Sequence, residues 1–153
     1  MKKIKVLIIS LIVVFIVAFL GSLLTGNVKS DWYQAIKPNI TPPSFVFPIA
    51  WSILFFLIAL SLCFSYINAK TKIDKGNIGA VFAANFLVNI AWSLLFFYLK
   101  NPAAAFVDII ILWVSILLMI FVTRKTSKLA SWLLVPYLLW VSFAVILNFL
   151  SIS

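Results

Sequence analysis

Five long apolar runs, four of them without any charged residue, constrain the fold of this chain more than any other feature. The first covers 19 residues, Val6 to Leu24, and the longest stretch without a charged residue extends from Pro38 to Ala69. A helix needs about 20 predominantly apolar residues to cross a bilayer. Within the hydrocarbon every backbone polar group must find a partner in the protein, and a helix provides these partners by itself. The runs therefore predict an all-α membrane protein, a bundle of five transmembrane helices.

We predict a single domain over residues 1–153, with an outer loop at 25–44. The spans are expected at about 5–24, 45–66, 78–99, 103–123 and 129–151, with short polar turns at 70–75, 100–102 and 124–128. The first run follows three lysines, as the apolar part of a signal peptide would. It is longer than such a region and no A-x-A cleavage site follows it, so we interpret it as the first span.

The composition excludes most catalytic and metal chemistry. The chain is 65% hydrophobic and only 10% charged, whereas soluble domains are about 25% charged. It contains no histidine, three scattered acids (Asp31, Asp74 and Asp108) and one cysteine, Cys63. A conventional zinc or di-iron site, a Ser-His-Asp triad and an intramolecular disulfide are therefore excluded. We predict no metal, no required cofactor and no conventional catalytic residue.

The basic residues predict how the chain lies in the cell membrane. Nine of the 12 lysines and arginines fall at the N-terminus, in 70–75 and in 124–128, and the other three fall in the alternate loops. Because cytoplasmic loops carry an excess of Lys and Arg, we expect the N-terminus in the cytoplasm and the C-terminus outside. The net charge of +9 is thus explained by topology, and no nucleic-acid partner is expected.

The segment from Trp32 to Trp51 lies on the predicted outer side and is rich in aromatic residues and proline. Proline fixes φ and biases the preceding residue away from helix, so this segment cannot be one helix. Pro42-Pro43 is expected to mark the start of the second span, because proline suits a first turn. The segment is either a lid at the membrane surface or an interfacial loop that Trp and Tyr anchor at headgroup level.

Three of the spans carry aromatic and amide side chains on one helical face. These faces hold Trp51, Phe55 and Ile58; Asn85, Asn89, Trp92 and Phe96; and Tyr137, Trp140, Ala144 and Asn148. Amides in a bilayer are costly unless they are paired, so the faces should point into the bundle. They would suit a cavity for a flat, mostly apolar ligand. The alternative is that these residues simply pack and hydrogen-bond the bundle.

Two other features of the spans have both a functional and a structural interpretation. Asp108 is the only acid inside a span, about one turn from its outer end. An intramembrane carboxylate is a candidate functional residue, but its shallow position favours a hydrogen bond at a helix end. Gly79, Ala80, Ala83 and Ala84 form a small-residue face on the third span, which could seat a second copy in a homodimer or pack within the bundle.

The order and spacing of these motifs resemble the tryptophan-rich sensory protein family, also called the TspO or translocator protein family. The matching residues are Trp32-Tyr33, Lys37-Pro38, Pro42-Pro43, Trp51, Asn89-x-Ala91-Trp92-Ser93, Phe96-Phe97, Val107-Asp108 and Pro136-Tyr137-x-x-Trp140-x-x-Phe143-Ala144-x-x-Leu147-Asn148. The chain departs from the family in three places. The WY-to-KP spacing is one residue shorter, Ile40 replaces the usual aromatic residue, and the proposed L/V-x-Y-x-K/R sterol motif is missing after Tyr137.

The resemblance implies a membrane receptor, usually dimeric, that binds porphyrins such as protoporphyrin IX and haem in a pocket between the helices under the first loop. Trp51 and Trp140 match tryptophans that face the ligand, and Tyr33 matches a lid aromatic. Phe55, Asn89, Trp92 and Ala144 match other wall positions. To these we add Phe96 and Tyr137 from their helical faces, Pro43 from the loop, and Lys37, whose ammonium group could reach a ligand's carboxylates.

Our leading hypothesis is therefore a membrane receptor or carrier for tetrapyrroles, with a sensory or transport role. Because the chain has no histidine, the commonest protein ligand of haem iron, we expect stacking rather than coordination to hold a metal-free porphyrin. The resemblance also implies two alternatives. One is light-dependent porphyrin degradation, with Trp51 and Trp140 as the photochemical residues, and the other is sterol or lipid transport.

Overall fold

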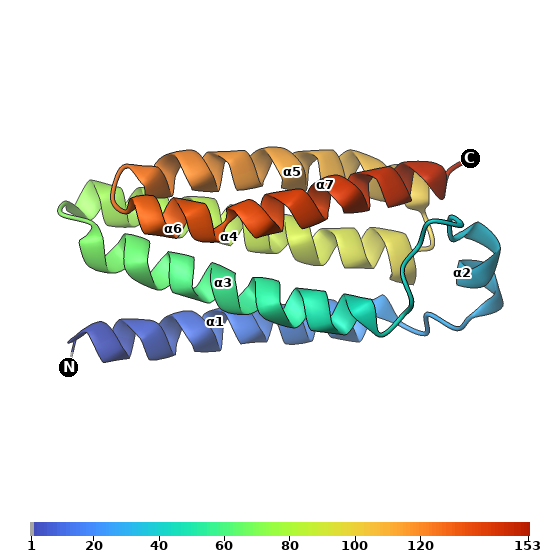
Figure 1. The fold of residues 1–153 in the computed structure, drawn as a ribbon, viewed down its shortest axis with the longest axis horizontal. Helices are drawn as coiled ribbons and strands as arrows, with labels where there is room; N and C mark the ends of the chain where they lie inside the picture. Colours follow the sequence, from blue (N-terminus) through green and yellow to red (C-terminus); the bar gives the residue numbers. More distant parts are fainter. Residues whose placement is uncertain (1) are drawn as a thin grey trace.

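The computed structural model describes residues 2–153, which form helices joined by short turns, with no strand among these residues (Figure 1). Five helical segments in this part of the chain are long and apolar enough to cross a membrane. They are α1 (Lys2–Thr25), α3 (Val46–Asn68), α4 (Lys72–Ser93) continued by η1 (Leu94–Tyr98), α5 (Pro102–Arg124), and α6 (Lys128–Leu133) continued by α7 (Val135–Leu150). The predicted five-helix membrane bundle is confirmed.

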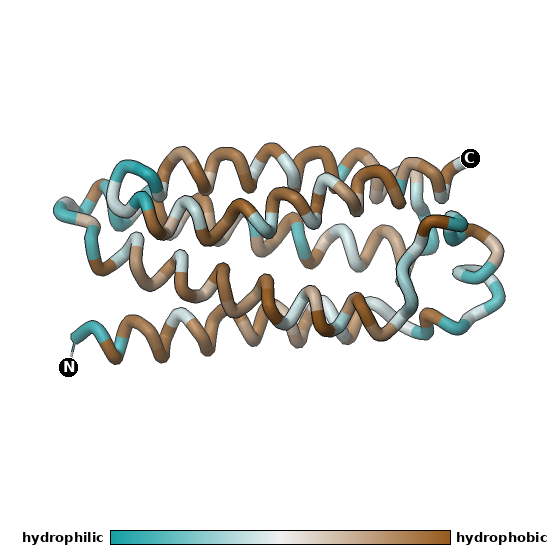
Figure 2. The backbone as a smooth tube through the Cα atoms, viewed as in Figure 1, coloured by the Kyte–Doolittle hydropathy of each residue, from teal (hydrophilic) through white to brown (hydrophobic). Residues whose placement is uncertain are grey.

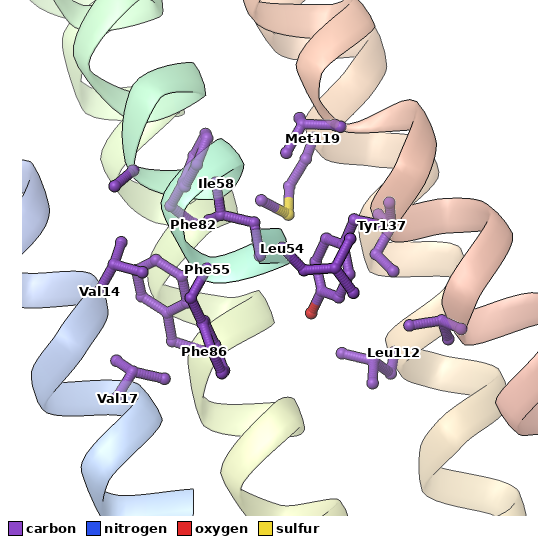
Figure 3. Close-up of a cluster of buried hydrophobic side chains, with 14 of the residues drawn as sticks. Val14, Val17, Leu54, Phe55, Ile58, Phe82, Phe86, Leu112, Met119 and Tyr137 are labelled. Carbon is purple, nitrogen blue, oxygen red and sulfur yellow. The ribbon is translucent and has the colours of Figure 1, made fainter. Parts of the chain in front are cut away.

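The core lies where all five spans meet. α1 packs against α3 and α4, α5 lies between α4 and α7, and α3 packs closely on α6. Figure 3 shows the buried side chains that fill this region: Val14, Val17, Leu54, Phe55, Ile58, Phe82, Phe86, Leu112, Met119 and Tyr137. Many large apolar side chains instead cover the outside of the bundle, as expected where hydrocarbon replaces water.

The third span begins earlier than the sequence pattern predicted. α4 starts at Lys72, so Asp74 and Lys75 belong to its first turn rather than to a polar turn at 70–75. Thr71 is the N-cap: its Oγ1 accepts a hydrogen bond from the Asp74 backbone N–H at 3.0 Å and donates one to the Asp74 carboxylate at 2.8 Å. Because this pair satisfies a free N–H at the helix start, the charged residues can continue the helix.

The outer loop contains a short helix that the sequence did not predict. α2 (Asp31–Ile36) is capped by Ser30, whose Oγ accepts from the Tyr33 backbone N–H, and it ends before Pro38. α3 begins at Val46, close to the predicted start of the second span at 45, but Pro42-Pro43 do not form its first turn as expected. The carbonyl of Pro43 accepts from the Val46 N–H at 3.0 Å, so these prolines form the turn that precedes the helix.

The fifth span is kinked instead of continuous. α6 ends at Leu133 and α7 begins at Val135, because Pro136 lacks an N–H and its ring crowds the carbonyl four residues earlier. Before the kink, the buried Ser61 Oγ donates to the Ala130 carbonyl at 2.7 Å and holds α6 against α3. After the kink, α7 packs mainly on α5 and diverges from α3 toward the end that carries α2 (Figure 1).

The third span ends in a π-helical turn. In η1, the Leu99 N–H donates to the carbonyl of Leu94, five residues earlier, at 2.8 Å. Such turns are rare in proteins, and those that occur are often found at functional sites. The wider turn directs two successive side chains, Phe96 and Phe97, toward α2.

Polar residues lie mainly at the two ends of the bundle (Figure 2). The three basic clusters predicted to share one side, at 2–5, 70–75 and 124–128, lie at the same end, and α2 and the C-terminus lie at the other. The fold therefore separates the two groups of charges on which the orientation depends. Which end faces the cytoplasm stays a prediction.

Candidate functional site

An aromatic cluster joins α3 to α7 in the half of the bundle nearer α2. Trp51 of α3 meets Tyr137 of α7 edge to face, with ring centroids 6.2 Å apart. Trp140 of α7 meets Phe47 of α3 in the same way at 5.8 Å, and Phe55 packs on Trp51 at 5.4 Å. We call these five residues the α3–α7 cluster. It brings together Trp51, Phe55, Tyr137 and Trp140, four of the predicted site residues.

The two tryptophans of this cluster keep their ring N–H groups free. Trp92 and Trp113 each donate their indole N–H to a side chain, but Trp51 and Trp140 donate to no acceptor within residues 2–153. Neither nitrogen is buried without a partner, so both remain accessible. A buried indole N–H usually finds a hydrogen-bond acceptor. Two half-buried indoles with free N–H groups therefore suit a ligand that carries hydrogen-bond acceptors.

The amides of α4 are already paired. Asn85 Nδ2 donates to Ser115 Oγ at 2.8 Å, and Asn85 Oδ1 accepts from the Tyr137 hydroxyl at 3.1 Å. The same hydroxyl accepts from Asn89 Nδ2 at 3.0 Å. Tyr137 is fully buried and Asn89 nearly so. These groups therefore tie α4, α5 and α7 together, as the structural interpretation of the stripes required.

Trp92 is held by a second polar connection nearer the end of the bundle that carries α2 and the C-terminus. Its Nε1 donates to Asn148 Oδ1 at 2.9 Å, and Asn148 Nδ2 donates to the Pro102 carbonyl at 2.8 Å. The position of the indole is thus fixed by α5 and α7. Its ring stacks on Phe96 at a centroid distance of 5.1 Å, so Trp92 contributes an aromatic face rather than a polar group.

α2 is closed over the end of the third span by aromatic contacts. Trp32 packs on Phe96 at 5.9 Å and Tyr33 on Phe97 at 5.7 Å, and we call these four residues with Trp92 the lid cluster. Lys100, which has a left-handed backbone (φ 50°), places its Nζ 5.9 Å from the centre of the Trp32 ring. Burial raises the pKa of Tyr33, so its phenol stays neutral at physiological pH.

The structure places the remaining predicted residues as follows. Lys37 is exposed and lines a polar hollow of about 380 Å³ between the loop after α2 and the end of α7, with Asn39 and Ser151. Pro43 is exposed in the turn before α3. Ala144 is half-buried on α7, one turn beyond Trp140. Lys37 thus lies beside the C-terminal end of α7, while the α3–α7 cluster lies deeper in the bundle.

A groove of about 520 Å³ lies along the seam where α3 and α7 diverge. Ala50, Ile53 and Leu54 form its α3 wall. The α7 wall is formed by residues from Pro136 to Phe143, including Trp140. Almost all of its surface is apolar, and it opens to the lipid-facing side of the bundle.

Asp108 forms no hydrogen bond within residues 2–153, and its Oδ2 is buried without a partner. The helix-end hydrogen bond favoured from the sequence is therefore not present. Asn101 caps α5 instead, because its Oδ1 accepts from the Ala104 N–H at 3.0 Å. The nearby Pro102 suits the first helical turn.

Two features of the site were missed by sequence reasoning. Phe47, the partner of Trp140, stands one helical turn before Trp51, and this spacing was the available signal. Trp113 of α5 donates its indole N–H to Ser142 Oγ of α7 at 2.8 Å. The two helices are neighbours in the fold but not in the sequence, so no local pattern marks this pairing.

Residues 9–152 match the sequence profile of the TspO/MBR family. The chain is 40% identical over 144 residues to "Tryptophan-rich protein TspO" of Archaeoglobus fulgidus, an alignment that covers 94% of this chain and 92% of that protein. It is 39% identical over 135 residues to the protein of the same name from Chlorobaculum tepidum, covering 87% and 85%. It is 30% identical over 120 residues to "Tryptophan-rich sensory protein" of Cereibacter sphaeroides, covering 78% and 73%.

Proposed function

This chain belongs to the TspO/MBR family of integral membrane proteins, and from that premise we propose that it is a receptor or carrier that binds tetrapyrroles such as protoporphyrin IX. The α3–α7 cluster is the binding site, and α2 is the lid. The name of the Cereibacter sphaeroides relative supports a sensory role for this chain too.

One observation carries this proposal: Trp51 and Trp140 are half-buried in an aromatic cluster and keep free N–H groups. The amides that could have served a polar ligand are engaged with protein partners. Recognition therefore falls to aromatic faces and two N–H donors, which fits a flat ring system that carries nitrogen or carboxylate acceptors. The absence of histidine from the sequence favours metal-free porphyrin over coordinated haem.

The proposal is tested by titrating the purified protein with protoporphyrin IX and following tryptophan fluorescence. We expect saturable quenching, and we expect Trp51→Ala and Trp140→Ala each to raise Kd by about fivefold, since an aromatic contact contributes about 1 kcal/mol beyond its burial. Trp132→Ala is the matched control, because Trp132 is 67% exposed on α6 and should leave Kd unchanged. Non-saturable quenching, or equal binding by all three variants, would contradict the proposal.

We also propose that the protein is a homodimer that packs through α4. Gly79, Ala80, Ala83 and Ala84 are all exposed, so this small-residue face is not used inside the bundle. A Cβ added at Gly79 would meet no atom within 4 Å. Small residues allow two helices to approach closely enough to pack in lipid.

The dimer is tested with the double variant Ala80→Leu and Ala84→Leu in nanodiscs. We expect the protein mass measured by light scattering to fall to that of a monomer, because two added isobutyl groups separate the backbones. Ala103→Leu adds the same group at an exposed position of α5 and should leave the mass unchanged. A dimeric mass for the double variant would refute this interface.

A further inference from the structure

We propose that the α3–α7 groove is the lateral passage through which the ligand moves between the bilayer and the α3–α7 cluster. This inference rests on the proposed function, since it concerns the route to that same site. Its occupant is the flat apolar ligand itself, in transit from the hydrocarbon region.

The groove opens where lipid surrounds the protein. Ile53 and Leu139 stand at its mouth, 56% and 65% exposed, and Leu54 forms its floor at only 5% exposed. Both helices belong to membrane spans, and the walls are almost wholly apolar. A porphyrin dissolved in the bilayer would therefore reach the groove without crossing water or losing hydration.

The inner side of the groove adjoins the binding cluster. Trp140 belongs to both, because it lines the groove and contacts Phe47. Leu54 is three residues from Trp51 on α3, close to one helical turn, and Figure 3 shows its side chain beside Tyr137. Trp140 thus stands between the groove and the rest of the cluster. Parting its contact with Phe47 is the movement that would let the ligand pass.

The backbone explains why the passage lies at this seam. Pro136 loosens the packing of the fifth span on α3, since α6 is bonded to α3 whereas α7 packs mainly on α5. A route past α2, at the end of the bundle, is covered by side chains. Trp32 and Tyr33 of α2 pack on η1, and Lys100 lies over Trp32. At the α3–α7 seam the groove is open to lipid as far as Trp140, whereas α2 is closed over the end of the third span.

A passage differs from a binding wall in its kinetic signature. Narrowing a passage raises the barrier for both directions, so the association and dissociation rates fall together and Kd stays constant. Altering a wall changes the stability of the complex, which appears mainly in the dissociation rate and in Kd.

The test uses the full chain in nanodiscs with protoporphyrin IX as the probe. Association is followed by stopped-flow tryptophan quenching, and dissociation by transfer of the porphyrin to an excess of haem-free globin. Ala50→Leu fills the groove, and we expect it to lower both rates by about tenfold with Kd changed by less than about twofold. Leu139→Ala widens the mouth, and we expect both rates to rise. Ala103→Leu is the control for added bulk elsewhere in the membrane surface.

The outcomes separate the passage from the binding function. Unchanged rates in Ala50→Leu and Leu139→Ala, with normal Kd, would overturn the passage alone and direct attention to the lid. A raised Kd with an unchanged association rate would also overturn it, because Ala50 would then belong to the binding site. If wild-type protein binds no porphyrin saturably, the proposed function fails first and the passage fails with it.

Discussion

Replacing Tyr137 with alanine is expected to lower the free energy of unfolding by about 4 kcal/mol, the largest effect of any single change considered for this protein. Tyr137 is fully buried, and its ring packs against Trp51. Its hydroxyl bonds both Asn85 and Asn89. The variant therefore leaves a cavity and also two amides that lose a partner inside the membrane. Thermal unfolding in detergent, followed by circular dichroism, measures the change.

Two companion variants show which part of that effect is polar. Tyr137→Phe keeps the ring and removes only the hydroxyl, so we expect a loss of about 1 kcal/mol, the usual size of a hydrogen-bond contribution between membrane helices. Tyr98→Ala removes the same side chain from a position that is 69% exposed and should change stability by less than about 0.5 kcal/mol. If Tyr137→Ala were no more destabilising than Tyr98→Ala, Tyr137 would not be the centre of the core.

Replacing Phe96 with alanine is expected to release α2 from the end of the bundle. Phe96 is 4% exposed and touches Trp32, Trp92 and Phe97, at centroid distances of 5.9, 5.1 and 4.9 Å. Loss of a buried phenylalanine costs about 3 kcal/mol, and that cost falls here on the contact that holds the lid. Amide hydrogen exchange in Asp31–Ile36 should therefore become about a hundredfold faster.

Exchange in the core of α5 should stay unchanged in this variant, because the aromatic partners of Phe96 all lie on α2, α4 and η1. Phe19→Ala serves as the matched control, since Phe19 is 62% exposed on α1 and should leave exchange in α2 as it is. Slow exchange of α2 in Phe96→Ala would mean that Tyr33 and Phe97 hold the lid without Phe96.

The sequence predicted the number of spans, their approximate bounds and the faces that meet, because bilayer thickness and helical periodicity leave little choice. It placed Trp51, Phe55, Tyr137 and Trp140 on facing stripes. The structure packs Trp51 against Phe55 and Tyr137, and it packs Trp140 against Phe47 of α3. It could not identify Tyr137 as the hydrogen-bond partner of Asn85 and Asn89. Such pairings depend on how helices that are far apart in the sequence pack against each other.

Three features of the backbone were not predicted from the sequence: the short helix α2, the early start of α4 and the kink of the fifth span. Each has a local cause that a hydrophobic pattern does not reveal. Ser30 and Thr71 each cap a helix with one hydroxyl, and these caps place α2 and the start of α4. Pro136 was read as part of a motif, but its effect on the path of α7 shows only when the neighbouring helices are in place. Lys37 was chosen for its charge alone, and the hollow that it lines together with Ser151 depends on the folded path of the loop.

The π-helical turn at Leu94–Tyr98 also determines how the third span would tolerate the deletion of one residue. In a regular helix, removing one residue rotates everything beyond it by about 100° and ruins the packing of one side. Here one extra residue is already accommodated in η1, so a deletion there would restore the regular helix and leave the residues before it undisturbed. Only Phe96, Phe97 and the turn to α5 would move. A single-codon deletion at this point would thus reassign the partners of the lid while sparing the bundle, whereas the Phe96→Ala substitution only removes one partner.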